Sequence, residues 1–469
     1  MHPILQAVQS AHTPESLTER LAGERGVVLL LSSYFDSPQA RYSFVTARPL
    51  LIFRCFGVQC ELLGAGGRQF GNPWRLLEEL MARYELLDEI DLPFPLGGCF
   101  GYWGYGLKHY VERGLPRRAV NDLELPDAHA GFYDSLVVFD HRLEKTWIVS
   151  TGLQPDGSRD AQRAREQFDF WAGHLAAAPV TRPARGGSVS SFRSNLSREQ
   201  FVAKVRRAQE YIRAGDIYQV NLSHRLRART DLAGWEFFQR LCDVSPAPFA
   251  AFLGCGQFQV CSSSPELFLR LNGPLALTRP IKGTRPRAAD ATRDAQLTYE
   301  LQTSAKDMAE LVMITDLLRN DLGKVCEFGS VQVPELVRLE RFPQVQHLVS
   351  TVTGRLRPDQ SHVSAFASCF PGGSVTGAPK IRAMEIIDEL EPVTRGPYTG
   401  AIGYLGFNRE SQLSITIRTA ICRPGEIYFH VGAGIVTDSV AEAEYDETMA
   451  KAGGFLAALR QRPRQFIRI

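Results

Sequence analysis

Short apolar runs with the composition of β-strands recur along the whole chain, and glycine or proline bounds most of them. Val, Ile, Phe, Tyr and Trp, which dominate these runs, are residues that strands favour. The clearest runs are residues 26–31 (GVVLLL), 133–140 (YDSLVVFD), 146–151 (TWIVST), 216–223 (DIYQVNLS), 400–407 (GAIGYLGF) and 412–422 (QLSITIRTAIC). Strands joined by short turns pair in antiparallel fashion. We therefore expect a mixed α/β or α+β protein with much antiparallel sheet.

Helical segments are fewer and better delimited. Residues 197–214 have apolar side chains at helical spacing, and Ser197 and Gln200 form a capping box at their start. In the strand that follows, alternation places Gln219 and Asn221 on one face. Further helices are expected at residues 304–320, 379–390 and 440–459, the last one begun by a capping box of Ser439 and Glu442.

The chain is long enough for more than one folding unit. Its 469 residues favour two or three units, although one large composite fold is also compatible with this length. Residues 176–195 are rich in Pro, Gly, Ser and Arg, which is typical of an exposed linker. We therefore divide the chain into residues 1–190 and residues 191–465.

The composition limits the location and the partners of the protein. Lys and Arg total 53 against 51 Asp and Glu, so no net basic field favours nucleic acid or an anionic membrane. The nine cysteines are scattered without a CxxC pair or zinc spacing, which favours free thiols in a reducing compartment. The longest apolar run near the N-terminus, Val27–Leu31, is far shorter than the roughly 20 residues that cross a bilayer. We expect a cytoplasmic protein.

Two pairs of acidic residues have helical i, i+3 spacing. They are Asp307 and Glu310 in the middle of the chain and Glu444 and Glu447 near its C-terminus. Facing one another, the two pairs would suit Mg²⁺, which prefers oxygen ligands and keeps positions open for substrate anions. Acidic pairs also commonly line solvated helix faces, so the spacing alone leaves both interpretations open.

Two glycine-containing segments are candidates for anion binding through backbone N–H groups. In residues 430–439, Gly432 and Gly434 allow the main chain to approach a carboxylate closely. In residues 371–388, the sequence TGAP at 376–379 leads into a helix with proline in its first turn, so the helix N-terminus would face an anion. Neither segment has Walker A or GxGxxG spacing, and a simple tight turn is the alternative for each.

The second half carries a set of segments that together resemble one family. The segments are PELFL (265–269), TRPIKGTRPR (278–287), DLLRNDLGKV (316–325), HLVST (347–351), PGGSVTGAPKIRAMEIIDELEP (371–392), GAIGYLGF (400–407), SITIRTA (414–420) and GAGIVTDS (432–439). They resemble the chorismate-utilising enzymes, which include anthranilate synthase component I, aminodeoxychorismate synthase component I, isochorismate synthases and salicylate synthases. The resemblance implies a large antiparallel β-sandwich flanked by helices, with residues 191–465 as the chorismate-binding catalytic domain.

The resemblance also implies a site for chorismate, which carries a ring carboxylate and an enolpyruvyl carboxylate. Glu310 and Glu447 would bind Mg²⁺ directly, Asp307 and Glu444 would support it, and the metal would hold the ring carboxylate. Family members usually have Glu at the position of Asp307. The residues implied to bind the anionic groups of the substrate are Thr376, Gly377, Lys380, Tyr404, Arg418, Gly432 and Gly434. For Arg418, a strand residue paired with an acid elsewhere is an equally good interpretation.

Gln219 stands at the position that separates the water users of the family from the ammonia users. Isochorismate and salicylate synthases resemble each other in having lysine there, a general base that activates water. A glutamine amide has no titratable proton acceptor, and ammonia needs no activation, so Gln219 favours the amine-forming branches. A strand glutamine can also serve only to form hydrogen bonds within the fold.

Lys282 in the segment PIKGT separates the two amine-forming branches. Anthranilate synthases have alanine in this motif, whereas aminodeoxychorismate synthases resemble this sequence in having lysine. The resemblance implies that the Lys282 amine attacks ring carbon 2 while Glu266 gives a proton to the departing 4-hydroxyl. His347 would orient the substrate or exchange protons. The alternatives are a Lys282 that only holds a carboxylate electrostatically and a structural His347.

The resemblance has consequences for partners and for a second ligand. We find no segment that resembles a glutamine amidotransferase domain, so ammonia is expected from a separate glutaminase subunit. The implied product is 4-amino-4-deoxychorismate, for 4-aminobenzoate and folate synthesis. The alternatives are anthranilate synthase component I and a non-catalytic scaffold that binds chorismate or tryptophan. Tryptophan bound in the first half of related proteins implies a second site at Ser32, Arg41, Tyr42, Pro248 and Phe249.

Overall fold

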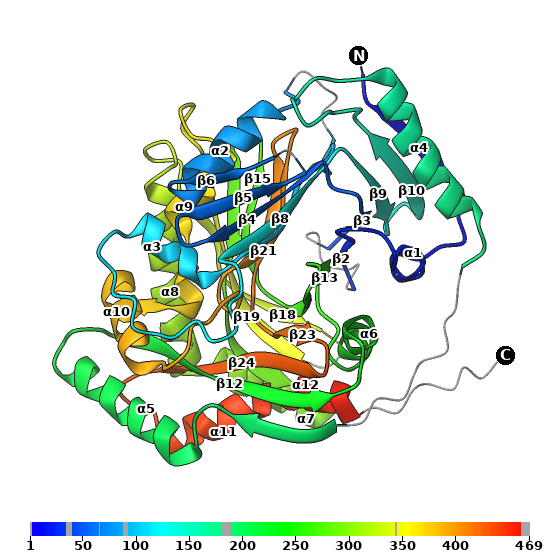
Figure 1. Ribbon diagram of the computed structural model, residues 1–469. Helices are drawn as coiled ribbons and strands as arrows, with labels where there is room; N and C mark the ends of the chain where they lie inside the picture. The colour runs from blue at the N-terminus through cyan, green and yellow to red at the C-terminus, as the bar shows by residue number, and fades with distance from the viewer. Residues whose placement is uncertain are drawn as a thin grey trace.

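The computed structural model describes residues 2–33, 40–64, 66–87, 92–179, 189–342 and 345–460. Their strands form two large sheets that pack face to face, with helices over the outer faces and at the ends (Figure 1). Every ladder between the named strands is antiparallel. The predicted mixed α/β class with a large antiparallel sandwich is therefore confirmed.

The first sheet contains twelve strands. In spatial order they are β1 (Ile4–Val8), β10 (Lys145–Ser150), β9 (Ser135–Asp140), β3 (Tyr42–Thr46), β2 (Val28–Leu31), β13 (Phe249–Gly254), β14 (Gln259–Ser264), β23 (Thr419–Arg423), β24 (Glu426–Ile435), β12 (Gln219–Thr230) and β11 (Val189–Ser194), with the short β20 (Gly377–Ala378) paired to β12.

The second sheet also contains twelve strands. In spatial order they are β17 (Ile281–Pro286), β19 (Val345–Arg355), β16 (Leu275–Arg279), β15 (Leu267–Asn272), β22 (Glu410–Ile415), β21 (Ala401–Gly406), β7 (Gly98–Trp103), β8 (Ala128–Tyr133), β4 (Leu51–Phe56), β5 (Gln59–Leu63) and β6 (Arg68–Phe70), with β18 (Gln332–Arg341) paired to β19.

Both sheets cross the division that we drew near residue 190. In the first sheet, β2 pairs with β13, so that Leu29 lies opposite Phe252. In the second sheet, β7 pairs with β21, so that Gly101 lies opposite Gly403. Of the expected linker, residues 180–188 lie outside the described part of the chain, and Val189–Ser194 form β11. The regions 1–190 and 191–465 thus share both sheets of one composite fold.

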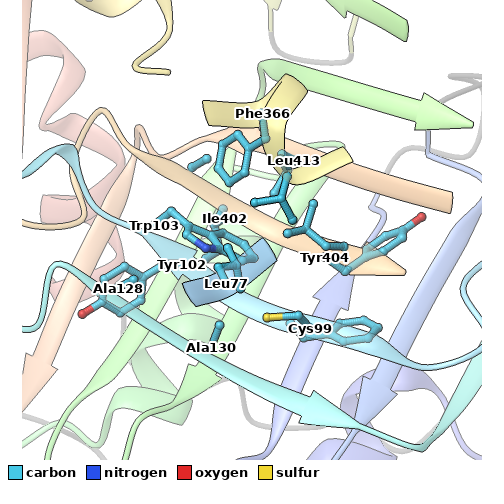
Figure 2. Packing of buried hydrophobic residues seen from close by; sticks show 14 of the residues in the cluster. Leu77, Cys99, Tyr102, Trp103, Ala128, Ala130, Phe366, Ile402, Tyr404 and Leu413 are labelled. Carbon is cyan, nitrogen blue, oxygen red and sulfur yellow. The ribbon is translucent and has the colours of Figure 1, made fainter. Parts of the chain in front are cut away.

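The main hydrophobic core fills the space between the two sheets. Tyr102 of β7, together with Ile402 and Tyr404 of the neighbouring β21, points into this layer (Figure 2). The next residue, Trp103, points to the opposite face of β7 and packs on Phe366 of α9, with ring centroids 5.3 Å apart. Phe44 of β3 meets Tyr404 across the layer, with ring centroids 5.2 Å apart. Burial of such large side chains is the main force that holds the sheets together, at roughly 25 cal/mol per Å² of apolar surface.

Helices cover the remaining faces of the sheets. A second core lies between the outer face of the first sheet and its helices. The helices are α1 (Pro14–Arg20), α2 (Pro73–Arg83), α3 (Lys108–Val111), α4 (Ala161–Ala176), α5 (Arg198–Arg213), α6 (Gly234–Val244), α7 (Ala291–Gln302), α8 (Ala305–Gly323), α9 (His362–Cys369), α10 (Lys380–Leu390), α11 (Ala441–Lys451) and α12 (Gly453–Arg460), with 3₁₀ turns η1 (Tyr105–Leu107) and η2 (Gly373–Val375).

Of the two capping boxes predicted at helix starts, one is confirmed and one is wrong. The Ser197 hydroxyl accepts from the Gln200 N–H and the reciprocal bond is present, so the predicted capping box is confirmed. The box predicted for Ser439 is wrong, because Val440 is the N-cap and the Ser439 hydroxyl donates to the Glu444 carboxylate at 2.6 Å. The single helix expected over residues 440–459 is divided into α11 and α12.

Among the described residues, no helix combines the length and the apolar character needed to cross a membrane.

Candidate functional site

Lys282 lies where the second sheet approaches α8 and α11. A β-bulge in β17 separates Lys282 from Thr284, and the intervening Gly283 has φ +71°, a conformation that favours glycine. A Cβ on Gly283 would lie 3.0 Å from the Asp307 Cβ, so the bulge also lets α8 pack closely against the strand. Bulges redirect the neighbouring side chain. Lys282 accordingly lies within electrostatic reach of Glu310 on α8.

Lys282 and Glu266 share a neighbour, Ser374 of η2. The Lys282 Nζ donates to the Ser374 carbonyl at 3.2 Å, and the Ser374 side chain hydrogen-bonds the Glu266 carboxyl. Burial lowers the pKa of Lys282, and the carboxyls of Glu310 and Glu266 oppose that shift. Burial raises the pKa of Glu266, which is 5% exposed. The structure thus places an amine with a lowered pKa next to a carboxyl with a raised pKa.

His347 supports this bulge. Its Nδ1 lies 2.8 Å from the Thr284 hydroxyl, and its ring also bonds the backbone of Gly283. Burial lowers the pKa of His347 to about 4, so the imidazole is neutral near neutral pH. These contacts fit an orienting role better than an exchange of protons.

Three of the four predicted acidic residues come near each other across α8 and α11. Burial raises the pKa of Glu310 and of Glu444, and the Glu447 carboxylate adds to both shifts. Burial also acts to raise the pKa of Glu447, but the Lys451 ammonium, 2.7 Å from its Oε1, lowers it overall. Negative charge therefore accumulates between the two helices, as the sequence pattern predicts.

Asp307 differs from the other three acids. Its Oδ2 is 3.0 Å from Arg285 Nη2, so an ion pair occupies the carboxylate, although Glu310 remains within its electrostatic reach. Within the described ranges, no three His, Cys, Asp or Glu side chains converge into a ready-made metal cage.

The glycines of residues 430–439 lie in a strand and not in the predicted turn. Gly432 and Gly434 belong to the part of β24 that pairs only with β12, beyond the end of β23. A Cβ on Gly434 would lie 2.5 Å from Gln219 Nε2, and one on Gly432 would lie 2.9 Å from the Tyr398 hydroxyl. Each glycine therefore makes room for a polar side chain.

Gln219 and Arg418 carry polar groups without partners. Gln219 Oε1 is buried and accepts no hydrogen bond from any described residue. Arg418 precedes β23 with φ +48°, and in the described part of the chain its guanidinium forms no hydrogen bond or ion pair. Burial lowers the pKa of Arg418, because nothing nearby compensates the charge. Within the described residues, the alternative that Arg418 is paired with an acid elsewhere is therefore not supported.

Two predicted substrate-binding side chains are engaged inside the fold. Lys380 Nζ is 2.7 Å from Asp321 Oδ2 and also donates to the Cys369 carbonyl, which ties α10 to α8. The ammonium of Lys380 is thus engaged inside the fold, and its predicted contact with substrate stays a prediction. The Thr376 hydroxyl is fully buried and donates to the Gly372 carbonyl at 3.1 Å.

Gly377 and the segment around it also pack inside the fold. Gly377 pairs with β12 as part of β20, and a Cβ there would lie 2.2 Å from the Gln219 carbonyl oxygen. Pro379, predicted in the first turn of a helix, is the N-cap of α10. The glycine is needed for close packing of the two strands.

Tyr404 lies elsewhere, and a second tyrosine stands at the site. Tyr404 stacks on Phe100 in the core, with ring centroids 5.4 Å apart. Tyr398, which the sequence reasoning missed, places its hydroxyl beside Gly432 and hydrogen-bonds Asn221. The available signal was its position in the Gly/Pro-rich turn TRGPYTG, immediately before a strand.

Tyr404 instead lines a small cavity between the sheets, of which about 30 Å³ is open to the centre of a water-sized molecule. Ser32, Tyr42, Pro248 and Phe249, all predicted for a tryptophan site, line the same cavity. Within the described residues the buried Tyr42 hydroxyl has no hydrogen-bond partner. Arg41 does not line this cavity, because its guanidinium forms a bidentate ion pair with Asp140 at 2.9 and 2.6 Å.

Cys99 stands in a short sequence that resembles a nucleophile elbow. Residues 97–101 (GGCFG) have the letters of a Gly-x-Cys-x-Gly nucleophile elbow, which the sequence reasoning overlooked. Cys99 lies inside β7 and is completely buried, and this burial raises the pKa of its thiol well above the usual value. A buried neutral thiol in a strand is not a nucleophile.

The fold and the site together define a class of protein. It is a two-sheet antiparallel enzyme whose site combines an amine, clustered carboxylates and an unpaired guanidinium, which suits a small substrate with more than one negative charge. Residues 32–457 match the family described as chorismate binding enzyme. The chain belongs to this family, and the protein is a chorismate-utilising enzyme.

Relatives with two different names are about equally similar. Aminodeoxychorismate synthase component 1 of Escherichia coli K12 is 41% identical over 448 residues, covering 94% of this chain and 95% of the relative. Anthranilate synthase component 1 of Thermus thermophilus is 40% identical over 454 residues, covering 95% of both. The crystal structure of anthranilate synthase component I from Streptococcus pneumoniae superposes with a TM-score of 0.78 at 31% identity, covering 90% of this chain and 93% of that one.

Proposed function

We propose that the protein is the chorismate-aminating subunit of 4-amino-4-deoxychorismate synthase, which converts chorismate and ammonia to 4-amino-4-deoxychorismate. The observation that carries the proposal is the Lys282 amine beside the Glu266 carboxyl, with Ser374 bonded to both. Anthranilate synthases resemble one another in having alanine at this motif position, so overall identity does not distinguish the two activities but residue 282 does.

The shifted pKa values of Lys282 and Glu266 support covalent catalysis. The lowered pKa of Lys282 increases the share of neutral amine, and the raised pKa of Glu266 keeps a proton available. In the first step Lys282 bonds ring carbon 2, the ring double bonds shift toward carbon 4, and the 4-hydroxyl leaves as water with the Glu266 proton. In the second step ammonia bonds carbon 4, the double bonds shift back and the lysine leaves. The proton lost by the new ammonium group returns to Glu266.

The residues around this pair suit the rest of the substrate. The unpaired Arg418 guanidinium is suited to the enolpyruvyl carboxylate, since its planar donors match a carboxylate fork. Tyr398 and the backbone at Gly432 lie on the β24 side of the site. Gln219 offers an unpartnered amide oxygen near Gly434 and no base that would activate water.

The acidic residues fit a magnesium ion. Glu310, Glu444 and Glu447 repel one another, and a divalent cation removes this repulsion more fully than Lys451 does. Glu310 and Glu447 would hold Mg²⁺, with Glu444 behind them, and the metal would supply charge for binding the ring carboxylate. Asp307, paired with Arg285, would support Glu310 only through its charge.

The source of ammonia completes the proposal. Relatives bear the name component 1, and this chain has its one elbow-like cysteine buried in the core. A separate glutamine amidotransferase subunit would therefore supply the ammonia. The cavity lined by Ser32, Tyr42, Pro248 and Phe249 is proposed as a tryptophan site.

The product distinguishes the two candidate functions. Purified protein is incubated with chorismate, Mg²⁺ and ¹⁵N-ammonium, with and without a cognate glutaminase, and products are identified by liquid chromatography and mass spectrometry. We expect ¹⁵N-labelled 4-amino-4-deoxychorismate and no release of pyruvate. Labelled anthranilate with an equal amount of pyruvate would show an anthranilate synthase instead, and unconsumed chorismate would favour a binding scaffold.

A further inference from the structure

A second cavity adjoins the proposed substrate site, and about 20 Å³ of it is open to the centre of a water-sized molecule. Tyr398 connects the two, because it lines this cavity while its hydroxyl lies beside Gly432. At the outer end, Asn121, Leu123 and Leu125 belong to the coil between α3 and β8, and Asn121 is exposed. This coil, drawn in cyan, runs alongside β24 (Figure 1). The cavity therefore extends from an exposed coil to a wall of the site.

His430 presents an unpartnered polar atom in this cavity. Its ring stacks on Tyr398, with centroids 5.2 Å apart and planes inclined by 13°, and the residue is only 8% exposed. Its buried Nε2 has no hydrogen-bond partner within the described ranges. Burial, reinforced by Arg225 and Arg395, lowers the pKa of His430 well below 6.5, so the imidazole is neutral. A buried polar atom of this kind requires a ligand or a water molecule.

The charged groups that face His430 are already neutralised. Arg225 forms a two-point ion pair with Asp122. Arg395 uses all five of its N–H donors, on Glu391 and on acceptors of Asn221, Val375 and Thr399. Neither guanidinium is left to bind an anion.

The remaining wall is mainly apolar, with Leu123, Ile421 and Phe429 among its side chains. A cation that entered this cavity would lose its hydration without gaining an unpaired carboxylate, because Asp122 and Glu391 are already paired with Arg225 and Arg395. The ligand that fits is small, uncharged and able to form one hydrogen bond.

We infer that this cavity holds ammonia, as the uncharged molecule, before it reaches the substrate, and that His430 Nε2 binds it. Ammonia both donates and accepts hydrogen bonds, so it satisfies this nitrogen in either tautomer of the imidazole. The inference rests on the proposed use of ammonia, but not on which amine is the product.

The test is the substitution His430→Phe, which keeps an aromatic ring on Tyr398 and removes the hydrogen-bonding nitrogen. Chorismate consumption is measured against ammonium concentration, at fixed pH and saturating chorismate, without a glutaminase. The matched control is His129→Phe: His129 is also 8% exposed and stacked on a tyrosine, Tyr102, and among the described residues its Nδ1 has no partner. His129 is not part of the cavity wall.

We expect His430→Phe to raise the KM for ammonia by about 2- to 10-fold, the value of one hydrogen bond, with the KM for chorismate unchanged. His129→Phe should change neither constant. An unchanged KM for ammonia, or an equal change in both variants, would overturn the inference. A change confined to the KM for chorismate would assign His430 to the substrate site instead.

A second variant, at the outer end of the cavity, tests the inference if His430→Phe does not fold. Leu123→Trp, in the coil at the outer end, fills the passage and should also raise the KM for ammonia; no change would contradict the inference. If the wild-type protein forms anthranilate, only the assignment to aminodeoxychorismate synthase fails, because the ammonia measurements remain valid. Chorismate consumption that does not depend on ammonia would refute both.

Discussion

Replacement of Arg418 by methionine should leave the free protein at least as stable as the wild type while it weakens the binding of chorismate. In the described structure the Arg418 guanidinium is buried without a carboxylate or a hydrogen-bond acceptor, and this burial lowers its pKa. A buried charge without a partner costs free energy, whereas the methionine side chain fills similar space without that cost. The residue is thus stabilised only when an anion is bound.

The magnitudes follow from the contacts. Loss of one charge-assisted interaction with a substrate carboxylate, about 1.5–3 kcal/mol, should raise the KM for chorismate by about 10- to 150-fold. The free energy of unfolding without ligand should stay the same or rise by about 0.5–2 kcal/mol, as is common when a functional group under strain is removed. Chorismate should also stabilise the variant less than the wild type, since ligand stabilisation follows affinity.

The matched control is Arg395→Met, which should lower the free energy of unfolding. Arg395 is buried more deeply than Arg418, and its guanidinium forms a bidentate ion pair with Glu391, at 2.8 and 2.6 Å. Its removal leaves the Glu391 carboxylate buried and unpaired, which should lower the free energy of unfolding by about 3–5 kcal/mol. Urea unfolding with and without chorismate, together with steady-state kinetics, measures both variants. An Arg418→Met protein that is destabilised like Arg395→Met, with an unchanged KM for chorismate, would refute the reasoning.

Three further predictions concern the proton donor Glu266, the proposed magnesium ligands and unfolding at low pH. Glu266→Gln should lower kcat by about 10²- to 10⁴-fold, because glutamine cannot give a proton to the leaving hydroxyl; kcat within a factor of two of wild type would exclude Glu266 as the acid. Glu310→Gln should raise the Mg²⁺ concentration needed for half-maximal activity, whereas the control Glu442→Gln should not, because exposed Glu442 on α11 pairs with Arg206 at 2.7 Å; equal metal dependence in both would contradict the proposed ligands. Burial lowers the pKa of six histidines from 6.5 to about 4, namely His109, His129, His141, His224, His347 and His362. The unfolded chain therefore binds more protons between these values, so the urea midpoint should fall as the pH is lowered from about 6.5 toward 4, and a constant midpoint would show that these histidines are not buried in solution.

Local patterns in the sequence predicted most elements but not their partners. The strand runs and the helices α5, α8 and α10 depend on period, capping and glycine punctuation, which are visible within a few residues. The pairing of β2 with β13 depends on contacts between residues more than two hundred positions apart. The Pro-, Gly- and Ser-rich composition near residue 190 therefore predicted two separate regions. In the structure, both regions contribute strands to the same two sheets.

The differences between expectation and structure at the site have the same origin. Lys380 follows a glycine- and proline-containing segment and was expected to face an anion, but Asp321 on another helix is its partner. Tyr404 and Tyr398 stand at the two ends of one short segment, and only the packing of the sheets shows which one faces Gly432. Ser439 has the letters of a cap, yet the helix begins one residue later. The acidic pairs on α8 and α11, by contrast, were predictable because helical spacing alone places them.

A covalent bond between Lys282 and the substrate tests the central claim most directly. The enzyme is mixed with chorismate and Mg²⁺ in the absence of ammonia, quenched in acid after a short incubation, digested and analysed by mass spectrometry. We expect the peptide with Lys282 to gain the mass of chorismate less one water, and this signal to disappear when ammonia is added or when Lys282 is replaced by alanine. An unmodified Lys282 peptide, together with a Lys282→Ala protein that turns over at the wild-type rate, would contradict the account.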